Sequence, residues 1–168
     1  MIAVRYVLAS SLLLMLAAAV AADEPKEKKF DKAELEKKFA ETMSGATMSG
    51  HFTVLGSDKP PRKETYTLGR VYKAKAGDYW IFETRIQYGD HDVTLPLSLP
   101  VLWAGDTAVI TVDKVPVPPL GVYSARVLVY NNQYAGTWDG GNHGGMLFGT
   151  ITPAAKKDSD AAKDGDQK

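Results

Sequence analysis

Apolar and polar residues alternate with a period of two along most of the chain between about residues 46 and 153. The clearest run is 92–103, where the apolar side chains fall on one parity and polar or proline residues on the other. This alternation is typical of strands that bury one face. We therefore predict about eight strands, at about 49–54, 63–75, 79–88, 92–103, 107–113, 122–130, 133–138 and 146–151.

Short turn sequences join these strands. Gly89-Asp90 and Asn131-Asn132 suit two-residue hairpin turns, because glycine and asparagine tolerate a positive φ. The apolar parity of the second strand shifts at Gly69, which predicts a β-bulge. Consecutive hairpins form an antiparallel up-and-down meander, so we predict an all-β fold. A small closed barrel is favoured because closure removes exposed edges, and a β-sandwich is the alternative.

Two segments depart from this pattern. Pro96 and Pro100 have no N–H to donate to a neighbouring strand, so the strand at 92–103 is predicted to lie at an edge, to bend or to be divided in two. Residues 114–121 contain three prolines and predict a stiff connector, partly in the polyproline II conformation.

A different period precedes the strands. Apolar residues recur at four-residue spacing within residues 30–44, which predicts an amphipathic helix with one narrow apolar face. Asp31 is a suitable N-cap, and Gly45 fits the left-handed position that follows a helix. We expect this helix to cover one mouth of the barrel or to lie along the sheet. Its apolar positions are Leu35, Phe39 and Met43.

Residues 1–22 have the features of a secretory signal peptide. Arg5 precedes an apolar run, and small residues follow that run. The run is shorter than the roughly 20 residues that a membrane-spanning helix needs. We expect cleavage after Ala21 or Ala22, which would leave a secreted or periplasmic protein with no membrane span.

Composition excludes several classes of function. The chain has no cysteine, and so no disulfide, thiolate ligand or Cys nucleophile. It has 20 basic and 20 acidic residues, and loss of Arg5 with the signal leaves 19 against 20. Without a net field we expect no nucleic-acid partner. The segments 23–29 and 154–168 are charged and predict a solvated leader and a disordered tail.

Several segments, at 99–111, 119–128, 134–138 and 144–149, resemble a family of small secreted bacterial proteins of unknown function. The likeness covers roughly residues 39–151 and implies a secreted location and a compact β domain. The triplet Gly136-Thr137-Trp138 is also similar to the Gly-x-Trp of the calycin group, which comprises lipocalins, avidins and some bacterial protease inhibitors. That similarity implies a ligand-binding barrel.

The sequence contains neither a serine in a nucleophile elbow nor a recognisable pair of catalytic carboxylates. We therefore expect a non-enzymatic barrel, without a cofactor, that binds a small apolar or amphipathic molecule in its interior. The predicted lining residues are Trp80, Phe82, Ile86, Leu95, Leu97, Val101, Trp103 and Trp138.

Three charged residues are the polar candidates: Glu83, Arg85 and Arg126. If they face inward, they form a polar floor that orients a ligand. If they face outward, they are ordinary cross-strand pairs, and we favour this alternative because buried charges need partners.

Two other functions are compatible with the sequence. An interaction module, such as an inhibitor or an envelope-associated protein, would present the turns 89–92 and 139–145 to a protein or a glycan. The other is a metal hydrolase, although the histidines lack the spacing of local metal motifs and we predict no metal. It would require at least three of His51, His91, His143, Asp90 and Asp92 to converge.

Overall fold

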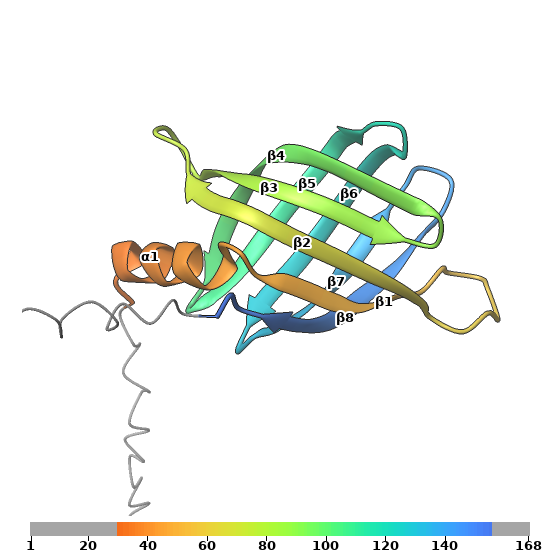
Figure 1. The fold of residues 1–168 in the computed structure, drawn as a ribbon, viewed down its shortest axis with the longest axis horizontal. Helices are drawn as coiled ribbons and strands as arrows, with labels where there is room; N and C mark the ends of the chain where they lie inside the picture. The colour runs from red at the N-terminus through yellow and green to blue at the C-terminus, as the bar shows by residue number, and fades with distance from the viewer. Residues whose placement is uncertain (1–29, 156–168) are drawn as a thin grey trace, which may run out of the picture.

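The computed structural model describes residues 30–155, which form eight antiparallel strands closed into a barrel with one short helix before them (Figure 1). Each strand pairs with the next, and β1 also pairs with β8. The predicted signal and leader, and most of the predicted tail, lie outside the described residues. The elements are α1 (Lys32–Met43), β1 (Thr47–Phe52), β2 (Arg62–Lys73), β3 (Tyr79–Tyr88), β4 (His91–Ala104), β5 (Thr107–Val117), β6 (Gly121–Tyr130), β7 (Gln133–Asp139) and β8 (Gly144–Thr152).

The up-and-down barrel is the predicted fold, and the β-sandwich alternative is wrong. The register of β2 with β3 shifts between Leu68 and Val71, which confirms the bulge at Gly69. The stiff connector predicted at 114–121 is wrong in its first half, because β5 continues to Val117. A second register shift lets Lys114 adopt a φ of 49° while the strand stays paired with β6.

The helix α1 has the predicted caps. The Asp31 carboxylate accepts a hydrogen bond from the Ala33 N–H at 2.9 Å, and Gly45 has a φ of 73°. Phe39 and Met43 on the apolar face of α1 are buried. The narrow apolar face is therefore the face that packs on the barrel.

The two ends of the barrel differ (Figure 1). At the end where α1 lies, the Phe39 ring packs edge-on against Trp80, Phe82 and Trp103, with centroids 5.1, 6.2 and 5.9 Å away. We call these four rings the aromatic plug. The opposite end, which we call the open mouth, is formed by the turns at 53–61, 89–90, 118–120 and 140–143.

The barrel wall is least continuous between β4 and β5. Pairing joins Val101–Ala104 of β4 to Thr107–Ile110 of β5. Among the described residues, no pairing between these two strands extends to 91–100 of β4 or to 111–117 of β5. We call this interruption the wall gap, and it runs from the middle of the barrel to the open mouth.

The two prolines of β4 lie along the wall gap. The Val101 N–H donates to the carbonyl oxygen of Asp78 at 2.9 Å, on the β3 side. Because N–H groups alternate between the two sides of an antiparallel strand, the nitrogens of Pro96 and Pro100 face the β5 side. An edge position therefore accommodates both prolines without the loss of a ladder hydrogen bond.

Candidate functional site

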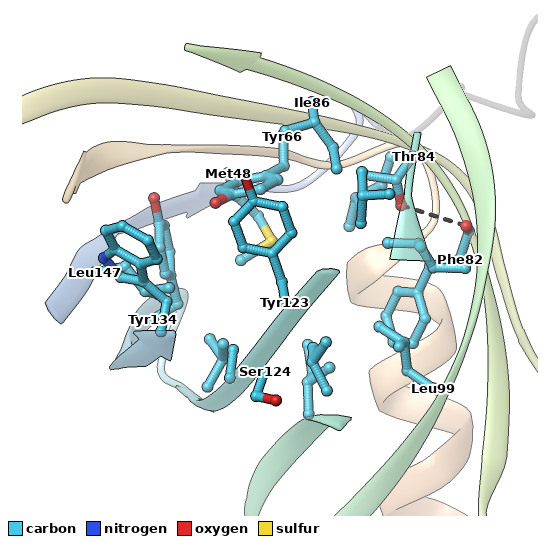
Figure 2. A pocket seen from close by; sticks show the side chains of 18 of the residues that line it. Met48, Tyr66, Phe82, Thr84, Ile86, Leu99, Tyr123, Ser124, Tyr134 and Leu147 are labelled. Atoms are coloured by element: carbon cyan, nitrogen blue, oxygen red, sulfur yellow. Dashed lines mark hydrogen bonds between the residues drawn. The ribbon is translucent and has the colours of Figure 1, made fainter. Parts of the chain in front are cut away.

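The interior of the barrel contains a cavity of about 190 Å³, which we call the main cavity (Figure 2). All eight strands contribute to its lining, and most of the lining side chains are apolar. Figure 2 shows Met48, Phe82, Ile86, Leu99 and Leu147 around it, with three tyrosines among them. The aromatic plug borders the main cavity on the side of the helix, because Phe82 belongs to both.

Half of the predicted lining residues line the main cavity. Phe82, Ile86, Leu97 and Trp138 do so. The others face inward at different levels of the barrel or lie beside the wall gap. Trp80 and Val101 are almost fully buried in the core, Trp103 belongs to the aromatic plug, and Leu95 is half-buried on β4.

A smaller chamber of about 130 Å³, the mouth chamber, adjoins the main cavity. The two spaces share a collar of four aromatic residues, together with Leu147. One of the four, Trp138, donates its indole N–H to the Thr53 carbonyl oxygen at 3.1 Å, which fixes the ring beside the open mouth. The collar consists of Tyr66, Tyr88, Tyr123 and Trp138.

A buried carboxylate lies in the mouth chamber. Glu64 is 5% exposed and accepts hydrogen bonds from the hydroxyl groups of Tyr66 at 2.8 Å and Tyr134 at 3.0 Å. Burial raises the pKa of Glu64, while the hydrogen bonds from the two tyrosines and the charge of His51 act in the opposite direction. Within residues 30–155, no basic side chain forms an ion pair with Glu64.

Three tyrosines that line the main cavity hold their protons firmly. Burial raises the pKa of Tyr66 and of Tyr134, and the charge of Glu64 raises both further. Burial and then a hydrogen bond with Tyr123 raise the pKa of Tyr88 to about 12. At neutral pH, Tyr66 and Tyr134 are therefore hydrogen-bond donors to the carboxylate.

Two glycines let Tyr134 reach Glu64 from three strands away. Tyr134, Gly149, Gly50 and Glu64 are successive register partners on β7, β8, β1 and β2. A Cβ at Gly50 would lie 2.5 Å from the Tyr134 hydroxyl oxygen, and a Cβ at Gly149 would lie 2.7 Å from its ring. The tyrosine ring and the backbone of the neighbouring strands therefore leave no room for a side chain at either position.

The three polar candidates lie on the outer surface. Glu83 is hydrogen-bonded to Arg70 at 3.0 Å, and Arg85 to Asp92 at 2.8 Å. Arg126 donates to the carbonyl oxygens of two residues, Val112 and Ala125. None of the three lines the main cavity or the mouth chamber. The three residues therefore face outward, which is the alternative that we favoured. The polar group of the interior is Glu64 instead.

The histidines are dispersed. His51 faces the Phe148 ring, His91 lies against Tyr88, and His143 packs on Trp138 with centroids 5.3 Å apart. Within residues 30–155, no group of three or more His, Asp or Glu side chains is arranged to hold a metal ion. The convergence that a metal hydrolase would require is not found in this part of the chain.

The outer surface carries a row of apolar residues. These residues are register neighbours across five adjacent strands, from β4 to β8. Three of them are between 44% and 49% exposed, and contiguous exposed apolar residues are more informative than scattered ones. The row, which we call the outer apolar row, consists of Leu102, Val109, Leu128, Ala135 and Phe148.

The fold and the cavity together define an eight-stranded up-and-down β-barrel with a hollow interior. Comparison with family models, curated proteins and solved structures found no match to this chain. The resemblances to small secreted bacterial proteins and to calycins therefore stay predictions. In the structure the Gly-x-Trp triplet lies on β7. Within the part of the chain that the structure describes, no helix is long and apolar enough to cross a membrane.

Proposed function

We propose that this protein is a non-enzymatic, secreted or periplasmic barrel that binds one small apolar or amphipathic molecule in the main cavity. The observation that carries the proposal is the cavity of about 190 Å³ among mostly apolar side chains. Protein interiors are packed to the density of organic crystals, and large voids are rare in them. An apolar cavity of about 150 Å³ in another protein binds benzene, so this space is adequate for a ligand at least as large.

The entrance to the cavity supports the same function. The aromatic plug blocks the helix end, whereas the aromatic collar joins the main cavity to the mouth chamber at the other end. At the wall gap, β4 and β5 are also not held together by the pairing that joins them near the helix end. A ligand can therefore enter without disruption of the helix or of the aromatic plug.

Titration calorimetry with benzene and with 1-hexanol tests the proposal. We expect saturable binding of one molecule per chain, accompanied by a change in tryptophan emission, because Trp138 lines the cavity. Native mass spectrometry after mild purification should also show a bound small molecule. Absence of saturable binding for both compounds would contradict the proposal.

A matched pair of variants locates the binding site. Ala125 lines the main cavity, so Ala125→Leu fills part of it and should abolish binding of both compounds. Ala135 is exposed on the outer apolar row, and Ala135→Leu adds the same atoms outside the barrel. Binding that survives in Ala125→Leu but is lost in Ala135→Leu would place the ligand on the outer surface.

The outer apolar row favours a second candidate, a protein-interaction module. The partner proposed for this candidate is a second copy of the chain, because an apolar sheet face can meet the same face of another barrel. Multi-angle light scattering at about 100 μM checks this, with Phe148→Lys as the disrupting variant. A monomeric wild-type protein would contradict self-association through the outer apolar row. Interaction through the turns 89–92 and 139–145 is a separate prediction.

A further inference from the structure

The mouth chamber has the chemistry of a site for a positively charged head group. It contains one buried carboxylate, from Glu64, and five aromatic residues among its ten lining residues. The faces of aromatic rings attract cations, and desolvation strengthens this attraction. The mouth chamber also adjoins the main cavity, so one ligand can place an apolar body in the main cavity and a polar end beside Glu64.

The hydrogen bonds of Glu64 are incomplete. Its Oε2 accepts from Tyr66 and its Oε1 from Tyr134, which is one bond for each oxygen. An ionised carboxylate can accept about four hydrogen bonds, so about two remain to be made. A buried carboxylate is costly unless it is paired, and within residues 30–155 no Lys, Arg or His is paired with it. A donor with a positive charge would supply both missing features.

Two basic side chains also line the mouth chamber. The Arg62 guanidinium lies over the Phe52 ring, 5.3 Å from its centroid, and the Arg62 side chain is exposed. His143 packs on Trp138 and is also exposed. Water screens exposed charges strongly, whereas the charge of a buried carboxylate is screened much less. The charge of His51 also acts on Glu64, but His51 does not line the chamber. Among the described residues that line the chamber, Glu64 therefore carries the one buried charge.

We propose that the polar end of the site binds the ammonium group of an amphipathic amine, with Glu64 as its counter-ion and the aromatic collar around it. The apolar part of the same molecule occupies the main cavity. This inference rests on the proposed function, because it assumes that the main cavity holds the rest of the ligand. The proposed function specifies the size and the polarity of the ligand, and this inference also specifies its charge.

Three probes of equal chain length test the inference on the wild-type protein: hexylamine, 1-hexanol and hexanoate. At about pH 8 the amine carries its proton and the acid is ionised. We expect hexylammonium to bind at least about tenfold more tightly than 1-hexanol, which corresponds to one charge-assisted hydrogen bond. Hexanoate should bind most weakly, because its charge would meet that of Glu64. Calorimetric dissociation constants give the comparison directly.

Variants assign the effect to one residue. Glu64→Gln should lower the affinity for hexylammonium about tenfold and leave that for 1-hexanol within about threefold. Glu83→Gln makes the same chemical change on the outer surface and should alter neither affinity. Thermal unfolding shows whether Glu64→Gln is folded, and the comparison of the three probes on wild-type protein stands even if it is not.

The outcomes separate this inference from the proposed function. If 1-hexanol binds and hexylammonium binds no better, the head-group inference is wrong and the cavity proposal survives. If hexanoate binds most tightly and Arg62→Gln abolishes the preference, Arg62 is the head-group site and the inference is overturned. If none of the three compounds binds, the proposed function fails and this inference fails with it.

Discussion

A substitution that fills the main cavity should stabilise the protein and remove its ligand site together. Ala125→Leu adds three carbon atoms to a side chain that lines the cavity. Burial of about 0.8 kcal/mol for each carbon gives about 2.4 kcal/mol, and the ordered leucine side chain loses about 0.5 to 1 kcal/mol of conformational entropy. We therefore expect a gain of about 1.5 kcal/mol in the free energy of unfolding, or about 6 °C in Tm.

Urea unfolding followed by tryptophan fluorescence measures this change, because Trp80 and Trp103 lie in the closed part of the core. The matched control is Ala135→Leu, which adds the same atoms to an exposed position and should change stability by no more than about 0.5 kcal/mol. The difference between the two variants isolates the effect of the cavity from that of the larger side chain itself.

Destabilisation of Ala125→Leu by about 1 kcal/mol or more would refute the reasoning, since it would mean that the added atoms meet a packed interior. A stabilised Ala125→Leu variant that still bound 1-hexanol with unchanged affinity would refute a different step. In that case the void exists, but the ligand binds elsewhere.

Four further predictions concern other parts of the structure. Phe39→Ala should lower the free energy of unfolding by about 3 to 5 kcal/mol in urea titrations, because it removes the central ring of the aromatic plug. Gly149→Ala should lower it by about 1 to 3 kcal/mol, since the new Cβ would clash with the Ser49 carbonyl oxygen and lie 2.7 Å from the Tyr134 ring; unchanged stability would show that β1 and the ring do not pack this closely on β8. The folded-state pKa of Glu64 is raised from 4.5, so its contribution to stability is full below about pH 4.5 and is lost as pH rises through the folded-state value. The unfolding free energy of wild type minus that of Glu64→Gln should therefore fall with rising pH in urea titrations between about pH 4 and 8, and a rise would contradict the assignment. The amide of Ser98 faces the wall gap and should exchange its hydrogen faster than the amides on either side of it, which NMR-detected exchange would show.

The fold was accessible to sequence reasoning because each of its determinants is local. A period of two identifies the strands, and the bounds predicted for one strand, 79–88, are those of β3. The bulge follows from the change of parity at Gly69, and the end of the helix from Gly45. These features depend on residues close together in the chain, so a pattern in the sequence is sufficient to place them.

The sequence pattern does not show how far along the barrel axis an inward-facing residue lies. Parity assigns Trp80, Val101 and Trp103 correctly to the interior. It does not say which of the inward residues lie beside the void and which lie in the closed part of the core. That depends on where Phe39 of α1 inserts, which is a contact between distant parts of the chain.

Glu64 was missed because a charged residue in a strand is normally exposed. Its position in the strand was informative, since Glu64, Tyr66 and Leu68 occupy every second position of β2 and therefore share one face. The partner that makes its burial possible is Tyr134, 70 residues away, which reaches it only because the intervening register positions are glycines. No local pattern contains that relationship.

The cavity and the carboxylate both bear on the ligand that we propose. The side chains around the main cavity of about 190 Å³ lack packing partners on one side, so part of their possible dispersion energy is not realised. This chain has no disulfide to compensate. A ligand present at about 100 times its Kd would restore about 2.7 kcal/mol. An amine beside Glu64 would also neutralise the one charge that the interior leaves without a basic partner among the described residues. A single molecule with an apolar body and a positive end would therefore offset both costs.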